Sequence, residues 1–223
     1  MPQQQWNVYD ADREDIIRLS RELHIFPLTA RLLLRRGFVS TQAARAFLEK
    51  SEEQFHDPFL LPDMEKAVTR LIAAVNRWEH ITVYGDYDAD GVSATAVLYT
   101  YLRNLGAQVD TYIPQRLTEG YGVSNEAIDT LHARGTQLIV TVDNGIASID
   151  EVAYASQLGM DVVITDHHRP REILPKAVAV VDPHRVDCTY PFKDLSGVGV
   201  AFKLITALEG EIADMTTLLE NYA

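Results

Sequence analysis

From residue 81 onward, short apolar runs alternate with helical segments, and this alternation constrains the fold more than any other feature of the chain. The apolar runs are 81–85, 109–113, 138–142, 162–165 and 177–181. Helical spacing of apolar residues follows the first three runs, and a last helix is expected after Gly199. Apolar strands that alternate with helices of about 10 to 15 residues are typical of βαβ units, in which helices cover both faces of a parallel sheet. The sequence therefore predicts an α/β fold with a parallel, Rossmann-like sheet flanked by helices.

Acidic residues follow three of these apolar runs. The acidic residues and their neighbouring histidines are Asp86, Asp88, Asp90, Asp143, Asp166, His167 and His168. Parallel strands end at one edge of a sheet, where α/β proteins bind their ligands. Carboxylates packed together repel each other unless cations lie between them. Oxygen ligands with one or two imidazoles suit Mn²⁺ or Mg²⁺, so the pattern predicts a site for two such ions.

Each part of this pattern has a simpler explanation when it is taken alone. An aspartate after a strand is often only the N-cap of the next helix, and a single histidine often has a structural role. The segment 86–91 also opens like a calcium EF-hand loop, but its twelfth position is Val97 where that loop needs a glutamate. Three acidic strand ends with a His-His pair favour a shared site over three separate caps.

Two glycine-containing turns do not match known phosphate-binding motifs. No Gly-Lys-Ser/Thr follows the turn at 120–122, so it is not a P-loop. The segment 197–201 resembles half of a dinucleotide-binding fingerprint, but it lies after the last predicted strand and not in the first turn. Neither turn indicates a competing chemistry.

Charge and composition limit the partners and the compartment. Twenty Lys and Arg against 32 Asp and Glu leave a net charge of −12, so a nucleic-acid partner requires a local basic groove or bound metal ions. The longest stretch without an ionised side chain, 91–102, is too short to span a bilayer, and the first 20 residues resemble no secretory signal. A single cysteine, Cys188, is compatible with a reducing cytosol. We expect a cytoplasmic protein with no membrane partner.

The chain divides into two parts by its sequence pattern. Residues 1–75 are expected to form an N-terminal helical segment, with helices near 29–37, 40–50 and 64–78. Residues 76–223 are expected to form the α/β domain.

Three segments resemble the first three motifs of the DHH phosphoesterase superfamily. They are Val83-Tyr-Gly-Asp-Tyr-Asp-Ala-Asp-Gly91, Val140-Thr-Val-Asp-Asn-Gly-Ile146 and Thr165-Asp-His-His168. Within this superfamily the chain is most similar to the bacterial single-strand-specific 5′→3′ DNA exonucleases. The segments 56–64, 114–122 and 195–202 support this resemblance, which covers about 25–210. Manganese inorganic pyrophosphatases share the Asp-His-His signature but not these flanking segments.

The resemblance implies a role for each residue of these motifs. Asp88 would bind one metal ion and Asp90 the other, with Asp143 bridging the two ions and His167 binding the second. His168 would contact the scissile phosphate or the leaving oxygen, so His168 and Asp143 are the expected catalytic residues. Asp86 would orient its loop, Asp166 would orient the imidazole, and Arg116 would hold the phosphate end of the strand.

The same resemblance implies a two-metal phosphodiester hydrolase that degrades single-stranded DNA from the 5′ end in recombination and repair. A helicase and a single-strand-binding protein are the partners that the family implies. Short oligoribonucleotides, pAp or cyclic dinucleotides are alternative substrates. A third possibility is a metal-binding or partner-binding module without turnover.

The chain departs from the family pattern in two places. Some relatives have a metal-binding histidine where this chain has Tyr84. The sequence also stops at Ala223, before the family's fourth aspartate motif and second domain. We therefore expect an N-terminal portion of such a nuclease that binds Mn²⁺ but has weak or absent exonuclease activity on its own.

Overall fold

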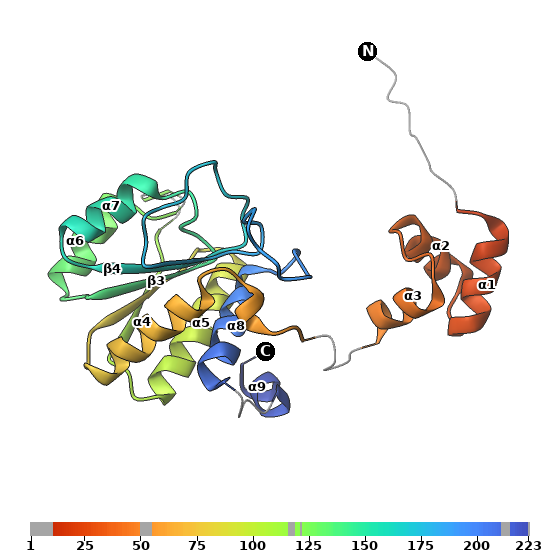
Figure 1. Ribbon diagram of the computed structural model, residues 1–223, viewed down its shortest axis with the longest axis horizontal. Coiled ribbons are helices and arrows are strands. Elements are labelled where there is room, and N and C mark those ends of the chain that lie inside the picture. The colour runs from red at the N-terminus through yellow and green to blue at the C-terminus, as the bar shows by residue number, and fades with distance from the viewer. Residues whose placement is uncertain (1–10, 50–54, 116–118, 121, 211–214, 223) are drawn as a thin grey trace, which may run out of the picture. The chain divides into compact units, whose positions relative to one another are not determined.

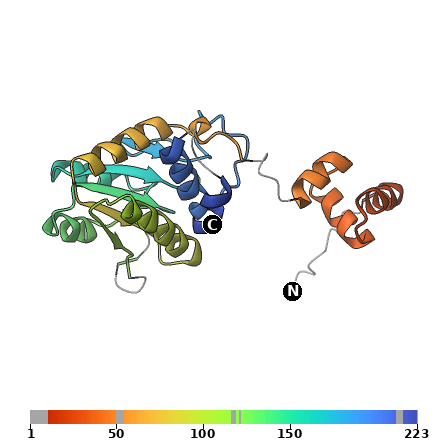
Figure 2. The same ribbon diagram turned by 90° about the horizontal axis from the view of Figure 1, so that it is seen from below.

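The structure is a computed structural model that describes residues 11–49, 55–115, 119–120, 122–210 and 215–222. The chain forms two compact units, Met1–Phe55 and His56–Ala223. Figure 1 and the turned view in Figure 2 show the helices of the first unit in red and orange, and the sheet of the second unit in yellow to blue.

The first unit contains helices α1 (Arg13–Leu23), α2 (Pro27–Arg35) and α3 (Thr41–Leu48). Its small core consists of Leu19, Ala30, Leu33 and Ala44. Side chains cap two of the helices, since Asp12 accepts a hydrogen bond from the Glu14 amide at 2.7 Å and Ser40 accepts one from the Ala43 amide at 3.1 Å. The part of this unit that the structure describes, residues 11–49 and 55, thus contains three helices.

The second unit is built on a five-stranded parallel sheet. Its strands are β1 (Ile81–Tyr84), β2 (Val109–Tyr112), β3 (Leu138–Val142), β4 (Asp161–Thr165) and β5 (Ala179–Val181). They lie in the order β2-β1-β3-β4-β5, and every neighbouring pair is parallel. Val142 pairs with Thr165, which in turn pairs with Val181, so β3, β4 and β5 end side by side. The predicted α/β fold is confirmed.

Helices cover both faces of this sheet (Figure 1). On one face lie α4 (Met64–Asn76), α5 (Ala89–Asn104) and α8 (Gly197–Glu209), and α6 (Asn125–Ala133) and α7 (Ile149–Gln157) lie on the other. Alternate strand residues therefore enter two different cores, with Val140 in the first and Ile139 in the second. A short 3₁₀ turn, η2 (Pro58–Leu60), precedes α4, and α9 (Met215–Tyr222) follows α8.

Two helices of the second unit begin earlier than the sequence pattern predicts, and both differences matter for the site. α5 begins at Ala89, because Asp88 is its N-cap. α8 begins at Gly197, because Ser196 caps it and accepts a hydrogen bond from the Gly199 amide at 3.2 Å. Because glycines are poor helix formers, the sequence pattern did not predict that the first turn of α8 includes Gly197. None of the helices in the described ranges combines the length and the apolar character that crossing a bilayer requires.

Candidate metal centre

The first acidic segment connects β1 to α5. Asp86 is buried, whereas Asp88 is exposed and its Oδ1 accepts a hydrogen bond from the Gly91 amide at 2.9 Å. Asp90 lies in the first turn of α5. A Cβ atom at Gly91 would lie 2.6 Å from the Cβ of Asp86, so only glycine lets the first turn of α5 approach the loop this closely. The Asp-x-Asp-x-Asp-Gly segment is therefore a compact turn that carries three carboxylates.

The second acidic segment is the turn that follows β3. Asp143 has a φ of +62°, in the left-handed region that aspartate tolerates better than most residues. The buried Asn144 side chain donates from Nδ2 to the carbonyls of Val142 at 3.0 Å and Tyr84 at 3.4 Å. Gly145 follows with a φ of +105°. Asn144 thus ties the turn to the ends of β3 and β1, and Asp143 is held at the edge of the sheet.

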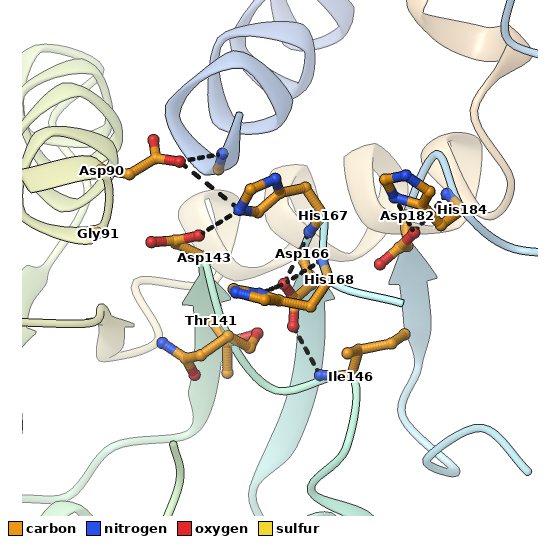
Figure 3. Close-up of polar contacts among 12 residues, drawn as sticks. Asp90, Gly91, Thr141, Asp143, Ile146, Asp166, His167, His168, Asp182 and His184 are labelled. Atoms are coloured by element: carbon orange, nitrogen blue, oxygen red, sulfur yellow. Dashed lines mark hydrogen bonds and ion pairs between the residues drawn. The ribbon is translucent and has the colours of Figure 1, made fainter. Parts of the chain in front are cut away.

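The third segment follows β4, and Asp166 organises it (Figure 3). Asp166 Oδ1 accepts hydrogen bonds from the amides of His167 at 2.7 Å and His168 at 3.1 Å. The same oxygen lies 2.8 Å from His168 Nδ1, and Oδ2 accepts a bond from the Ile146 amide at 2.9 Å. Asp166 is 1% exposed, so it acts as an internal anchor that orients the imidazole of His168 and ties this loop to the turn after β3.

These three segments meet at one edge of the sheet (Figure 3). His167 Nε2 lies 3.0 Å from Asp143 Oδ1 and 3.6 Å from Asp90 Oδ2. Among the described residues, two groups of side chains have ligand atoms within 4.8 Å of one another: Asp86, Asp88 and Asp143 form one, and Asp143, His167 and His168 form the other. Asp143 belongs to both groups, so its carboxylate can reach two cations at once.

The electrostatics of the edge reflect this crowding. Burial and the nearby carboxylates of Asp90 and Asp88 raise the pKa of Asp143 to about 7. The hydrogen bond with Asp166 raises the pKa of His168 to about 9. The bonds that Asp166 accepts from His168 and from the backbone outweigh its burial and hold its pKa below the ordinary value. An acidic group with a raised pKa and an acidic group with a lowered pKa thus lie within one cluster.

The donor set fits divalent cations. Asp143 Oδ1 is buried and has no hydrogen-bond partner in the described parts of the chain, although His167 Nε2 lies at ion-pair distance. Among those residues no lysine or arginine forms an ion pair with Asp88, Asp90, Asp143, Asp166 or Asp182. A buried carboxylate is unfavourable unless a cation neutralises it. Oxygen ligands with one or two imidazoles match Mn²⁺ and Mg²⁺.

The structure brings most of the predicted site residues together. Asp88, Asp90, Asp143 and His167, the expected ligands, lie at the same edge, and Asp86, Asp166 and His168 lie beside them. Arg116, predicted to hold a phosphate, lies outside the described residues. Tyr84 turns away from this edge, because its side chain is fully buried in the core beneath α6 and α7 and its hydroxyl donates to the Gly122 carbonyl at 3.0 Å.

Two features of the site were missed by the sequence analysis. Asp182, after β5, is fully buried with Oδ2 unpartnered in the described region, and His184 lies next to it (Figure 3). Burial and the charge of Asp166 raise the pKa of Asp182 to about 7. Ligands of α/β proteins bind beyond the carboxyl ends of the strands, so the predicted run 177–181 already points to the residue that follows it, Asp182. The second feature, the contact of α8 with Asp90, involves residues 107 positions apart, and no local pattern signals it.

Comparisons with known proteins agree with this geometry. The family described as "DHH family, N-terminal domain" matches residues 80–223. The single-stranded-DNA-specific exonuclease RecJ of Bacillus subtilis is 48% identical over 94% of this chain, and that of Escherichia coli is 45% identical over 84%. The match covers 27% and 32% of those two proteins, so the chain spans about a third or less of their length.

Solved structures show the same similarity. A RecJ exonuclease bound to manganese superposes with a TM-score of 0.63 at 37% identity, over 69% of this chain and 39% of that one. RecJ of Thermus thermophilus in complex with Mn²⁺ gives a TM-score of 0.64 at 29% identity, over 91% of this chain and 28% of that one. The family match begins near the boundary predicted at residue 76, whereas the compact unit begins at His56.

Proposed function

The chain belongs to the DHH family, and from this premise we propose that it supplies the metal-binding part of an exonuclease that degrades single-stranded DNA from the 5′ end. The cofactors are two Mn²⁺ or Mg²⁺ ions. The similarity to RecJ proteins, and to RecJ structures that hold these ions, supports both parts of the proposal. The family resemblance also implies a role in recombination and repair and partnership with a helicase and a single-strand-binding protein. The cytoplasmic location that we propose rests on composition, since a single cysteine is compatible with a reducing cytosol.

The position of Asp143 is the observation that carries this proposal. Its buried carboxylate is shared by two groups of potential ligands that come from three different strand ends. In our assignment Asp88 would join Asp143 at one ion, with Asp86 beside them, and Asp90 and His167 would join Asp143 at the other. When bound, two such ions activate a water molecule near neutral pH and stabilise the charge that develops on the phosphate.

The histidine and aspartate side chains supply the rest of the chemistry. Because Asp166 lies at Nδ1 of His168, the ring is fixed in one orientation and its protonated form is favoured. We assign to His168 the contact with the scissile phosphate or the leaving oxygen, where an imidazolium stabilises negative charge and donates a proton. Arg116 is assigned to the phosphate end of the strand on the resemblance alone.

The charge balance is consistent with a nucleic-acid substrate. The chain carries a net charge of −12, which repels a polyanion at long range. Divalent cations held by the acidic edge reverse the sign of the potential where the phosphate has to lie. Binding of the strand should therefore depend on the metal.

A chimeric enzyme tests this proposal. The matching segment of B. subtilis RecJ is replaced by this chain, and the chimera is assayed with Mn²⁺ on 5′-phosphorylated single-stranded DNA, on pAp and on a dinucleotide. We expect mononucleotide release from the 5′ end of the strand, and a loss of about 100-fold or more in Asp90→Asn. Hydrolysis of the small substrates alone would favour the alternative substrate class. A folded chimera with no activity on any of these substrates would contradict the proposal.

A further inference from the structure

The glycine-rich start of α8 has no role in the function proposed so far, although it lies directly against the acidic edge. We propose that this first turn is a positioning element of the metal centre: it fixes the carboxylate of Asp90 and sets the place of Asp143. The inference rests on the proposed function, since it concerns the same two carboxylates.

The first observation is the pair of hydrogen bonds at the N-terminus of α8. The Gly197 amide donates to Asp90 Oδ2 at 2.7 Å, and the Val198 amide donates to Asp90 Oδ1 at 2.8 Å (Figure 3 shows Asp90 and one such contact). Both oxygens accept hydrogen bonds from one helix end, and a carboxylate is a favourable group at the N-terminus of a helix. Asp90 is therefore held in one rotamer, and its Oδ2 also faces His167 at 3.6 Å.

The second observation is the close approach of Gly197 to Asp143. A Cβ atom at residue 197 would lie 2.5 Å from both the Cβ and Oδ1 of Asp143. Contacts under 3.0 Å force one of the two groups to move, and Asp143 sits in a buried turn that is tied to two strands. Only glycine allows α8 to contact Asp143 and hold Asp90 at the same time.

The same turn has no amide left for a phosphate. Gly197 and Val198 donate to Asp90, the Gly199 amide donates to Ser196 Oγ at 3.2 Å, and the Val200 amide donates to the Ser196 carbonyl at 3.0 Å. The N-terminal amides that bind an anion in dinucleotide-binding folds are thus satisfied within the protein. The segment 197–201, which resembles half of a dinucleotide-binding fingerprint, therefore holds the carboxylate of Asp90 and does not form a nucleotide site.

Gly199 provides a matched control within the same turn. A Cβ atom there would meet only Leu195 and Ser196, at 3.4 Å or more, which is ordinary contact. Alanine at either position also favours the helix by the same intrinsic preference. A difference in Mn²⁺ affinity between Gly197→Ala and Gly199→Ala therefore reflects the contact with Asp143 and not a change in helix propensity.

The test is a titration of the 223-residue chain with Mn²⁺, in which the EPR signal of the free ion is followed. Melting in EDTA by circular dichroism checks that each variant folds. We expect G199A to bind Mn²⁺ like the wild type and G197A to bind it about 10-fold or more weakly, the loss typical when a group that orients a ligand is disturbed.

A second pair of variants tests the hydrogen bonds without adding a Cβ atom at 197. Val198→Pro removes the amide that donates to Asp90 Oδ1, and proline is tolerated in a first helical turn. Val198→Ala keeps that amide and controls for the loss of the valine side chain. We expect V198P to bind Mn²⁺ several-fold more weakly than V198A, and this comparison decides the matter if G197A does not fold.

The outcomes separate the inference from the proposed function. If the wild-type chain binds no Mn²⁺, the metal centre and the positioning role fall together. If the wild type binds Mn²⁺ and both G197A and V198P bind it as tightly as their controls, the metal centre stands and the positioning role is wrong.

Discussion

At the amino end of the sheet Arg70 contacts both Glu79 and Asp161, whereas at the carboxyl end Asp143 and Asp182 are buried and form no ion pair with a lysine or arginine in the described residues. The Arg70 guanidinium lies 2.5 Å from Glu79 Oε2 and 2.6 Å from Asp161 Oδ2. Asp143 and Asp182 are 2% and 0% exposed, and the pKa of each is raised to about 7. The carboxylates at one end of the sheet are paired with arginine, whereas those at the other end have no lysine or arginine partner among the described residues.

We interpret this difference as a separation between an end of the sheet that stabilises the fold and an end where we expect cations to bind. A paired, hydrogen-bonded charge contributes to stability or is neutral, whereas a buried unpaired carboxylate lowers it. The carboxyl end compensates in part with backbone amides, as Asp90 and Asp166 illustrate. We therefore expect substitutions at the two ends to have opposite effects on stability and on metal binding.

The largest effect is expected for Asp143→Asn. Asparagine has the same shape and tolerates the positive φ, but it cannot bridge two cations. We expect Mn²⁺ affinity to fall by about 100-fold or more. At about pH 8, above the pKa of Asp143, the metal-free protein should be equally stable or gain about 1 kcal/mol, because a buried charge is removed. Mn²⁺ titration and urea unfolding in EDTA measure the two quantities. An Asp143→Asn chain that keeps its affinity, or unfolds at lower urea, would contradict the comparison.

The second prediction concerns pH. The pKa values of Asp143 and Asp182 are raised from 3.8 to about 7, so the folded chain holds protons that the unfolded chain releases. Stability of the metal-free protein therefore falls as pH rises from about 4 to about 7, by a few kcal/mol in total. His168 acts in the same direction, because its pKa is raised from 6.5 to about 9 and its contribution is lost as pH rises through that range.

Urea midpoints between about pH 5 and pH 9 in EDTA measure this slope. The double variant Asp143→Asn with Asp182→Asn should flatten the part below about pH 7, and saturating Mn²⁺ should remove or invert the slope in the wild type. A metal-free wild type whose stability rises across this range would show that these carboxyl groups are not held protonated by the fold.

The third prediction addresses the amino end. Glu79→Gln leaves Arg70, whose side chain is only 14% exposed, with a single carboxylate partner. We expect the free energy of unfolding to fall by about 2 kcal/mol, with Mn²⁺ affinity unchanged. Urea unfolding and the Mn²⁺ titration again provide the two readings. A change in metal affinity without a change in stability would reverse the roles assigned to the two ends.

The smallest effect is expected for Arg77→Ala, which removes another partner of the same glutamate. Arg77 Nη1 lies 3.7 Å from Glu79 Oε1, but its side chain is 72% exposed. Water and salt screen such a pair, so the free energy of unfolding should change by less than about 0.5 kcal/mol. A loss of unfolding free energy as large as that of Glu79→Gln would mean that burial does not determine which ion pairs stabilise this end of the sheet.

Residues that share a strand-end position are predictable from the sequence, because parallel strands end together whatever the details of packing. This rule alone places Asp86, Asp143 and Asp166 at one edge of the sheet. The roles assigned to these residues stay a prediction. Asp182 obeys the same rule, because it directly follows β5, which ends at Val181, although it was not among the predicted site residues.

The rest depends on packing that no local pattern encodes. The direction of the Tyr84 side chain follows from which face of β1 meets α6 and α7, and this short strand, which is buried on both faces, does not show which face that is. The contact of Gly197 with Asp143 and Asp90 requires α8 to begin beside the turn after β3 and the first turn of α5, which are both far away in the chain. Such a contact cannot be predicted from the sequence pattern and is seen only in the structure.

The most direct test of the central claim is a crystal structure of the chain soaked with Mn²⁺, with anomalous scattering recorded at the manganese absorption edge. The account predicts two anomalous peaks at the carboxyl end of the sheet, both in contact with the carboxylate of Asp143, one beside Asp86 and Asp88 and the other beside Asp90 and His167. Anomalous peaks located only elsewhere, or an ordered Asp143 carboxylate that contacts no manganese at saturating concentration, would contradict it.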